Sequence, residues 1–456
     1  MSPTSSLSPK RSTWQEAVRL SLPATLSLLL HAGYRVNDQY WIAPLGPDAQ
    51  AAFGVTSFQL IFNFALIVLV QAGTLARVAR HTGSGDKNSR DKVFQTMVPV
   101  GFLWFVTIGI IGWVTTPYAA TLLGASGEVH DLAVAYLRAI YAGLPFLALK
   151  PFIDGVFLGL GNTFTPMVLA GLSVGLNFVL NPLLIFGYAG FPEMGIAGAG
   201  VATCISRGLC GAFGLILLSK HYGMKPLRPI FHWPELKRVL QIGLPVSFSN
   251  AAYSLSFIAV LKTSVAPFGR DVQAGIGVAF NGLEAVSYCG YMGPAIACSS
   301  LVGRRLGAKD YVGANEAVKA CLCMSLLIAG IATVLFLSIP ERLVGMYTDS
   351  PEVMAAAALY LWVVGWTQML TATDSVLQQA LSGAGRTFLM SITTVSGLAI
   401  RVPLAWLLAH HLVWGPKGIW WAFNISNCIK LVAIVAVFRF IGLHKVAVQR
   451  TPPPSP

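Results

Sequence analysis

The sequence has few charged side chains for its length. Lys, Arg, Asp and Glu together make up 11% of its 456 residues, whereas a soluble domain carries about 25%. The chain also lacks an HExxH zinc motif and a Walker phosphate-binding loop. These absences argue against a soluble domain, a zinc hydrolase and an ATP-driven pump within this chain.

Cysteine is also scarce, and its spacing does not suit a metal. The seven cysteines fall in apolar stretches, and their spacing matches no zinc motif. We therefore expect no metal site, and we interpret the cysteines as small core residues.

Long apolar stretches dominate what is present. Hydrophobic residues make up 55% of the chain, and its mean hydropathy is +0.66. About 20 apolar residues are enough for one helical crossing of a bilayer. Twelve crossings are predicted, near residues 17–43, 50–76, 93–116, 130–158, 164–187, 194–219, 239–265, 272–300, 314–338, 353–382, 388–410 and 418–441. The expected fold is an all-α integral membrane protein.

The two halves of the sequence repeat each other. The string APLGPDAQAAFGV from Ala43 to Val55 returns as APFGRDVQAGIGV from Ala266 to Val278. Four shorter pairs follow the same order: Leu22-Pro23 with Leu244-Pro245, Gly83-Ser84-Gly85-Asp86 with Gly307-Ala308-Lys309-Asp310, Gly161-Asn162-Thr163-Phe164 with Gly385-Arg386-Thr387-Phe388, and Gly195-Ile196 with Gly418-Ile419. Convergent turn chemistry could produce the short pairs, but the first pair extends beyond turn residues. Six crossings per half give both halves the same direction, which predicts two parallel six-helix bundles related by pseudo-two-fold symmetry.

The repeat also sets the predicted boundaries. They are a cytoplasmic tail at 1–14, a bundle at 15–219, a cytoplasmic linker at 220–236, a second bundle at 237–442 and a disordered tail at 443–456. A membrane protein built from two matching halves is usually a carrier that holds its cargo between them and exposes it to each side in turn.

Basic residues are concentrated in the loops on one side. They follow crossings 2, 6 and 8: Arg77, Arg80, Lys87, Arg90 and Lys92, then Lys220, Lys225, Arg228, Lys237 and Arg238, then Arg304, Arg305 and Lys309. The positive-inside rule places both termini in the cytoplasm. The net charge of +13 is thus mostly a topology signal, and because no loop is long enough to form a basic face we expect no nucleic-acid partner.

Four segments resemble the multidrug and toxic compound extrusion (MATE) family, and the resemblance extends over nearly the whole chain. They are LPATLSLLLHAGYRVNDQYWIAPLG (22–46), LGLGNTFTP (158–166), LNFVLNPLLIFGYAGFPEMGIAGAGVAT (176–203) and LVGRRLGAKD (301–310). The resemblance implies two six-helix bundles facing a central cavity. It also implies export of cationic or amphipathic compounds in exchange for protons or sodium ions. We expect a monomer surrounded by lipid in the plasma (inner) membrane, with no cofactor beyond the coupling ion.

Asp38 is the leading candidate for binding the coupling ion. It lies in the outer half of the first crossing, where the family has its cation-coupling aspartate, and His31, Arg35 and Asp38 are spaced to share one helix face. A change in its charge could alter the helix at Pro23, where a backbone hydrogen bond is missing. The alternative is a permanent Arg35–Asp38 ion pair. Nearby, Tyr34 is a candidate cavity residue, because an aromatic ring can stack on a flat cation.

The fifth crossing supplies two amides. Asn177 matches a family asparagine, and Asn181, one turn later, stands where many members have an aspartate. We expect these amides to bond Asp38 or to coordinate a cation, and the alternative is ordinary interhelical hydrogen bonding. Pro182 follows directly and loosens the helix.

The fourth crossing carries Lys150 and Asp154 at i, i+4 spacing. A neutralising internal pair is the favoured interpretation. A role in coupling or in lining the cavity is the alternative.

The second half offers two carboxylates and one departure from the family pattern. Glu284 and Asp374 resemble family acidic positions in crossings 8 and 10, and either could attract a cationic compound or cycle protons. Each could instead be paired permanently with a cation of the same half, namely Lys262, Arg401 or Lys430. Sodium-type members often have a glutamate in crossing 7, where this chain has Tyr253, a further cavity candidate. That difference favours protons.

Two other functions remain open. Related transporters flip lipid-linked sugars and should carry cations for a diphosphate, and this chain places six cations within its crossings: Arg35, Arg138, Lys150, Arg207, Lys262 and Arg401. The other alternative is a membrane-embedded enzyme, for which turnover without an ion gradient would be the evidence.

Overall fold

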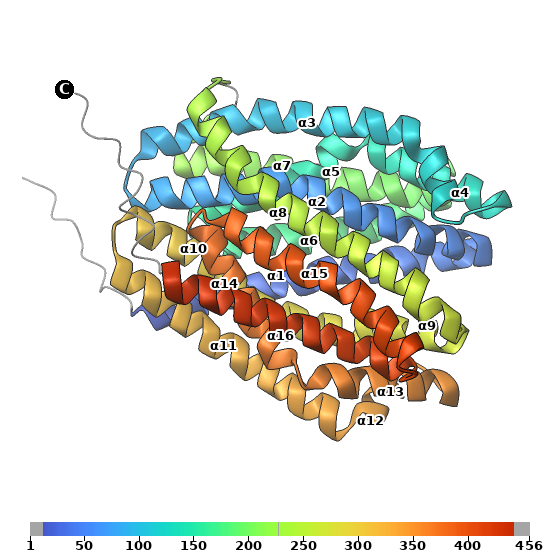
Figure 1. Ribbon diagram of the computed structural model, residues 1–456. Coiled ribbons are helices and arrows are strands. Elements are labelled where there is room, and N and C mark those ends of the chain that lie inside the picture. Colours follow the sequence, from blue (N-terminus) through green and yellow to red (C-terminus); the bar gives the residue numbers. More distant parts are fainter. Residues whose placement is uncertain (1–11, 227, 442–456) are drawn as a thin grey trace, which may run out of the picture.

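The computed structural model describes residues 12–226 and 228–441 (Figure 1). The regular elements of these residues are helices. The first half contains α1 (Thr13–Ile42), α2 (Pro47–Gly83), α3 (Lys87–Leu122), α4 (Gly127–Ala142), α5 (Leu144–Gly159), α6 (Phe164–Ile185) and α7 (Ile196–Tyr222). The second contains α8 (Trp233–Val260), α9 (Arg270–Val278), α10 (Ala285–Gly307), α11 (Tyr311–Ser338), α12 (Pro340–Val344), α13 (Pro351–Gly365), α14 (Gln368–Gly383), α15 (Thr387–Trp406) and α16 (Pro416–Ile441).

These helices make the twelve predicted crossings. Among the described residues, nine continuous helices are long and apolar enough to span a bilayer, and two bent pairs bring the number to eleven. The bent pairs are α4 with α5, at 57°, and α13 with α14, at 59°. The twelfth crossing is α1, whose 30 residues include Arg19, Arg35 and Asp38 and are therefore less apolar. The all-helical fold predicted from the sequence is confirmed.

The duplication is visible in the backbone of corresponding turns. The first repeat forms a short 3-10 turn at Ala43–Leu45 followed by Gly46 at φ 101°, and its copy forms one at Ala266–Phe268 followed by Gly269 at φ 93°. A left-handed φ of this kind is accessible to glycine without strain. In the second pair, Asp86 and Asp310 each cap a helix by accepting a backbone N–H three residues later. The sequence repeat is therefore a structural repeat.

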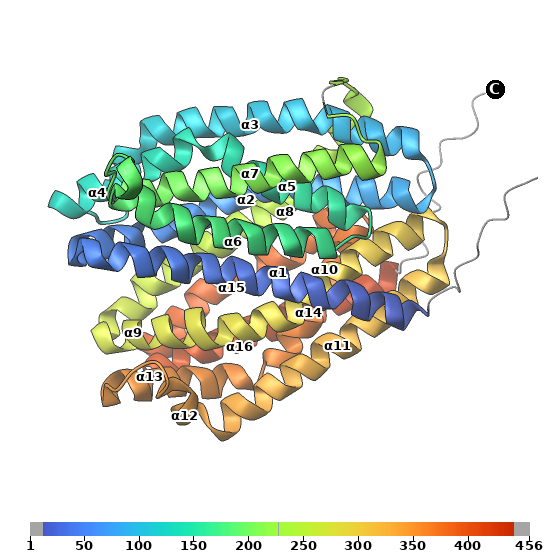
Figure 2. The same cartoon turned by 180° about the vertical axis from the view of Figure 1, so that it is seen from behind.

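The chain folds into two groups of helices that lie side by side. Figure 1 shows α2–α7 in blue to green above α13, α14 and α16 in orange and red, with α1 between the two sets, and Figure 2 shows the same division from behind. We call the end that carries residues 84–86, 223–226, 228–232 and 308–310 the basic end. The start of α1 and the end of α16 also lie there (Figure 1).

The two groups touch most closely toward the basic end, through glycines. A Cβ on Gly243 of α8 would lie 2.0 Å from the backbone oxygen of Leu69 on α2, and one on Gly73 would lie 2.3 Å from that of Val239. On the other side, a Cβ on Gly293 of α10 would lie 2.7 Å from the Thr25 nitrogen of α1. These helices approach backbone to backbone, as small residues allow in membranes.

A methyl group at this contact should weaken the packing between the two groups. We expect Gly243→Ala to lower the melting temperature, because the backbone of Leu69 must move to make room. Gly175→Ala in α6 is the matched control, since a Cβ there meets nothing within 4 Å. Equal melting temperatures for the two variants would contradict this assignment.

Three details differ from the expectations or lie beyond the structure. Most of the basic residues expected in loops lie instead in the end turns of helices, namely Arg77 and Arg80 in α2, Lys87, Arg90 and Lys92 in α3, Lys220 in α7, Lys237 and Arg238 in α8, and Arg304 and Arg305 in α10. Five cysteines are buried as expected, but Cys323 and Cys428 are exposed. The predicted domain boundaries stay a prediction, and the tails fall almost wholly outside the described residues.

Candidate functional site

Asp38 sits in a buried polar cluster of the first group. Its side chain is 5% exposed, while Asn177 and Asn181 on α6 are fully buried. Asn181 Nδ2 donates to Asp38 Oδ1 at 2.9 Å, and Thr203 Oγ1 on α7 faces Oδ2 at 3.4 Å. The predicted contact between Asp38 and the amides of the fifth crossing is present.

Two members of this cluster were missed from the sequence. Asn37 Nδ2 donates to Asn177 Oδ1 at 2.6 Å, and Thr203 contacts both Asn177 and Asp38. Asn37 directly precedes Asp38, and Thr203 is the last residue of the segment 176–203. Sequence spacing alone did not predict that either side chain would contact this cluster. Asn37 Oδ1 is buried and accepts no hydrogen bond from the described residues. With the Asp38 carboxylate, it is an oxygen donor of the kind that hard cations prefer.

The first crossing does not form the single polar face expected. Arg35 is exposed and makes no ion pair with Asp38 among the described residues, so the permanent pair considered above is wrong. Tyr34 is 2% exposed and hydrogen-bonds Ser173 and Ser206, with the Arg207 guanidinium 4.7 Å above its ring. Its surroundings are those of a packed residue. Its role in a cavity stays a prediction.

Lys150 and Asp154 form the internal pair that their spacing indicated. Lys150 Nζ lies 2.6 Å from Asp154 Oδ2, and their side chains are 1% and 8% exposed. Asp154 Oδ1 accepts no hydrogen bond from the described residues. The two charges therefore compensate each other within α5.

Glu284 is held by neutral groups. It ends a π-helical segment, Ala279–Glu284, and it accepts hydrogen bonds from Tyr360 on α13 and from Gln368 on α14, the latter at 3.3 Å. Among the described residues it makes no ion pair with any of the three cations considered for it. Tyr360 and Gln368 were not identified from the sequence.

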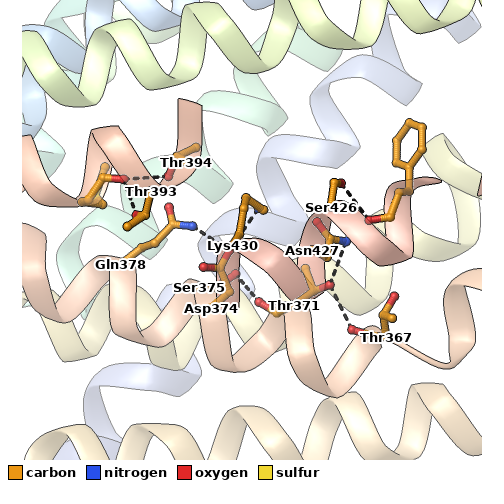
Figure 3. Close-up of polar contacts among 12 residues, drawn as sticks. Thr367, Thr371, Asp374, Ser375, Gln378, Thr393, Thr394, Ser426, Asn427 and Lys430 are labelled. Atoms are coloured by element: carbon orange, nitrogen blue, oxygen red, sulfur yellow. Dashed lines mark hydrogen bonds and ion pairs between the residues drawn. The ribbon is translucent and has the colours of Figure 1, made fainter. Parts of the chain in front are cut away.

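Asp374 is paired, unlike Glu284. Lys430 Nζ on α16 lies 3.1 Å from Asp374 Oδ2, and Gln378 Nε2 donates to the same oxygen at 2.6 Å (Figure 3). Arg401 instead donates to Ser426 at 2.9 Å and to Asn427 at 2.8 Å, and it lies 4.4 Å from the Phe423 ring centre. One of the three predicted partners of Asp374 is thus the one found.

The remaining candidates have simple placements. Tyr253 on α8 is 39% exposed. Pro23 and Pro182 lie inside α1 and α6, and both helices continue through them. Pro182 directly follows Asn181, so the helix lacks one backbone donor beside the Asp38 cluster.

Ion pairs join the two groups at the basic end. Arg77 of α2 binds Glu235 of α8 through two nitrogens, each 2.8 Å from a carboxylate oxygen, and both side chains are less than 10% exposed. Glu16 of α1 binds Arg304 at 2.8 Å and Arg305 at 3.0 Å, both on α10. Sequence reasoning took these arginines only as orientation signals. The structure uses them to close one end of the molecule.

One sequence pattern typical of hydrolases is present, but it does not lie in its usual structural context. Residues Gly171–Gly175 have the GxSxG spacing of a hydrolase nucleophile elbow, but they lie inside α6, not at a strand-to-helix turn. Ser173 there hydrogen-bonds Tyr34. Within residues 12–226 and 228–441, no three His, Cys, Asp or Glu side chains gather as a metal site.

Comparison with known sequences finds one family model that matches each half of the chain separately. The family model described as MatE matches residues 23–183 and, separately, residues 245–407. A Thermotoga maritima protein named "Probable multidrug resistance protein NorM" is 27% identical over 422 residues, which cover 89% of this chain and 88% of that protein. Bacillus subtilis "Probable multidrug resistance protein YoeA" is 24% identical, with 96% of each chain covered.

Solved structures share the fold. A crystal structure of MATE in the straight conformation superposes with a TM-score of 0.87 at 22% identity, covering 96% of this chain and 98% of that one. The bent conformation gives 0.85, also at 22% identity with the same shares covered. A structure described as the outward-facing conformation of a multidrug resistance MATE family transporter gives 0.83 at 22% identity, covering 97% and 98%.

Proposed function

Because the chain belongs to the MATE family, we propose that it exports cationic or amphipathic compounds in exchange for protons. The basic end would face the cytoplasm, and the membrane would be the plasma (inner) membrane. The names of full-length relatives support multidrug efflux, and the concentration of basic residues in the loops and helix ends of one side supports the orientation. A membrane-embedded enzyme has no comparable support.

The observation that carries this proposal is the double role of α1. Its outer part holds Asp38 against α6 and α7, while its inner part contacts α10 through Thr25 and Glu16. Pro23 lies between Asp38 and Glu16, where the helix lacks a backbone hydrogen bond. A change in the charge of Asp38 can therefore act through the continuous helix α1 on the contact between the two groups of helices.

The coupling would work by competition between two states. Asp38 in its charged form accepts hydrogen bonds from Asn181 and Thr203 and so holds α1 to α6 and α7. Protonation weakens both bonds, because a neutral acid is a poorer acceptor than a carboxylate. If the proton and the cargo favour opposite-facing states, an inward proton gradient drives outward movement of the cargo.

The choice of proton over sodium rests on residue types. Tyr253 stands where sodium-type relatives often have a glutamate, which removes one hard ligand from the second half. The oxygen atoms around Asp38 could also coordinate sodium, so sodium is the alternative ion.

One observation favours a second cargo class. Arg207 and Arg401 lie within the crossings, and neither forms an ion pair with a carboxylate among the described residues. A structure with a TM-score of 0.85 to this chain is described by a reversed polarity of its binding pocket and a different function. An anionic or lipid-linked cargo is therefore the competing proposal, since arginine suits phosphate recognition.

Transport in proteoliposomes separates these proposals. With purified protein, an imposed pH gradient is expected to drive accumulation of a fluorescent lipophilic cation, and a sodium gradient alone is not. A protonophore should abolish the signal. If the protein transports a fluorescent lipid-linked phosphate but not the lipophilic cation, its cargo is anionic and not cationic. If a sodium gradient alone drives transport, the coupling ion is sodium and not the proton.

A further inference from the structure

We propose that Lys430 is a built-in counter-ion that keeps Asp374 from binding an exchangeable cation. The coupling ion would then act only where a carboxylate has no resident cation. This extends the proposed coupling scheme, but it concerns ion binding alone and is testable without any cargo.

The lysine is held in place by the packing of its stem. Lys430 is 8% exposed and Asp374 is 4% exposed. A Cβ on Gly397 of α15 would lie 2.1 Å from Lys430 Cγ and 2.8 Å from Cδ. The stem therefore occupies the space that a side chain on α15 would otherwise fill. Its ammonium group is directed at Asp374 (Figure 3).

Asp38, the buried carboxylate near α6 and α7 in the first half, is compensated differently from Asp374. Asp38 is as buried as Asp374, yet its hydrogen-bond donors are an amide and a hydroxyl, and it has no ion pair among the described residues. A buried carboxylate without a cation attracts one from solution, whereas a carboxylate with a tethered ammonium is already compensated. The two acids therefore differ in their capacity for a mobile cation.

The surroundings of Asp374 are otherwise suited to a hard cation. Thr371 and Gln378 lie one turn away on α14 and share its face, and Asn427 of α16 contacts Thr371 at 3.4 Å. Thr371 and Gln378 provide a hydroxyl and an amide oxygen beside the carboxylate, whereas the amide oxygen of Asn427 already accepts from Arg401. Removal of the ammonium leaves these oxygens and one uncompensated negative charge, which is the donor set that sodium prefers.

The test measures sodium-specific stabilisation of purified full-length protein. Asp38→Asn combined with Glu284→Gln is the background, so that neither buried carboxylate without a resident cation can respond, and melting is compared in NaCl and in choline chloride of equal concentration. We expect no difference for this background. Adding Lys430→Met, which keeps the apolar stem, should raise the melting temperature in NaCl by about 3 °C over choline chloride.

Two further variants identify the site. Adding Asp374→Asn to the Lys430→Met protein should remove the sodium effect, and Lys430→Arg, which keeps the charge, should never acquire it. Lys430→Met protein that is stable only in NaCl would also support the proposal. The proposal is overturned if the Lys430→Met protein melts alike in both salts or cannot be purified in either. It is equally overturned if the background alone shows a sodium effect that Asp374→Asn removes.

Discussion

Replacing Asp38 with Asn is expected to abolish export while leaving a folded protein. Asparagine has nearly the same shape, and its carbonyl oxygen still accepts a hydrogen bond from Asn181 or Thr203. It takes up neither a proton nor a compensating charge, so the α1 contacts no longer respond to the gradient. Cells that express the variant should be as sensitive to ethidium as cells without the protein, and the purified variant should release no protons on cargo addition.

Asp48→Asn is the matched control for this prediction. Asp48 is exposed at the start of α2, so the same chemical change should leave resistance at the level of the unmodified protein. Both variants must be present in the membrane at equal amounts, measured by immunoblotting. Full resistance in the Asp38→Asn strain would remove Asp38 as the coupling residue.

Glu235→Ala should open the basic end. Removing one partner of a buried ion pair costs about 3–5 kcal/mol, because the other charge is left buried and uncompensated. Here Arg77 is that charge, and separation of α2 from α8 returns it to water. The open arrangement should gain roughly a hundredfold to a few thousandfold in population relative to the closed one. Spin labels at exposed Lys87 and Val312, one on each helix group, should move apart.

Three further variants are controls for the opening of the basic end in Glu235→Ala. Arg77→Ala combined with Glu235→Ala leaves neither charge, so it should open the end less than Glu235→Ala alone. Glu16→Gln should have a small effect, since its pairs are 21–29% exposed and such pairs contribute about 1 kcal/mol or less. Glu341→Ala, at an exposed position of α12, should change nothing. An unchanged label distance in Glu235→Ala would show that the pair does not hold the end closed.

Hydrophobicity and repetition were enough to predict the fold. The predicted crossings agree with the observed helices to within several residues. A helix that crosses a bilayer needs a long apolar segment, and the long apolar segments of this chain are easily located in its sequence. The turn geometry at Gly46 and Gly269 was implied by their shared sequence. Ion pairs between the groups were not predictable, since Arg77 and Glu235 are far apart in sequence and only packing brings α2 to α8.

The candidate site was predicted in part. Spacing along one helix related Asn177 to Asn181 and Lys150 to Asp154, because residues four apart face the same way. Spacing failed for Arg35 and Asp38, where one side chain is exposed and the other points into the bundle. Partners from other helices, such as Thr203 and Tyr360, depend on how each helix is rotated, which a single sequence does not specify.

The two bent crossings bear on the history of the chain. The first bend, of 57°, lies close to Pro145 and Pro151, whereas the second, of 59°, has no proline between Trp366 and Gly383. Because corresponding crossings bend equally with and without proline, proline does not produce the bend, and we infer that the bend belongs to the duplicated unit. Two halves in one chain can differ in sequence, and here one half pairs its lysine within α5 while the other pairs a lysine of α16 with Asp374. Because the two halves belong to one chain, each can compensate its buried carboxylates in a different way, which two identical subunits could not do.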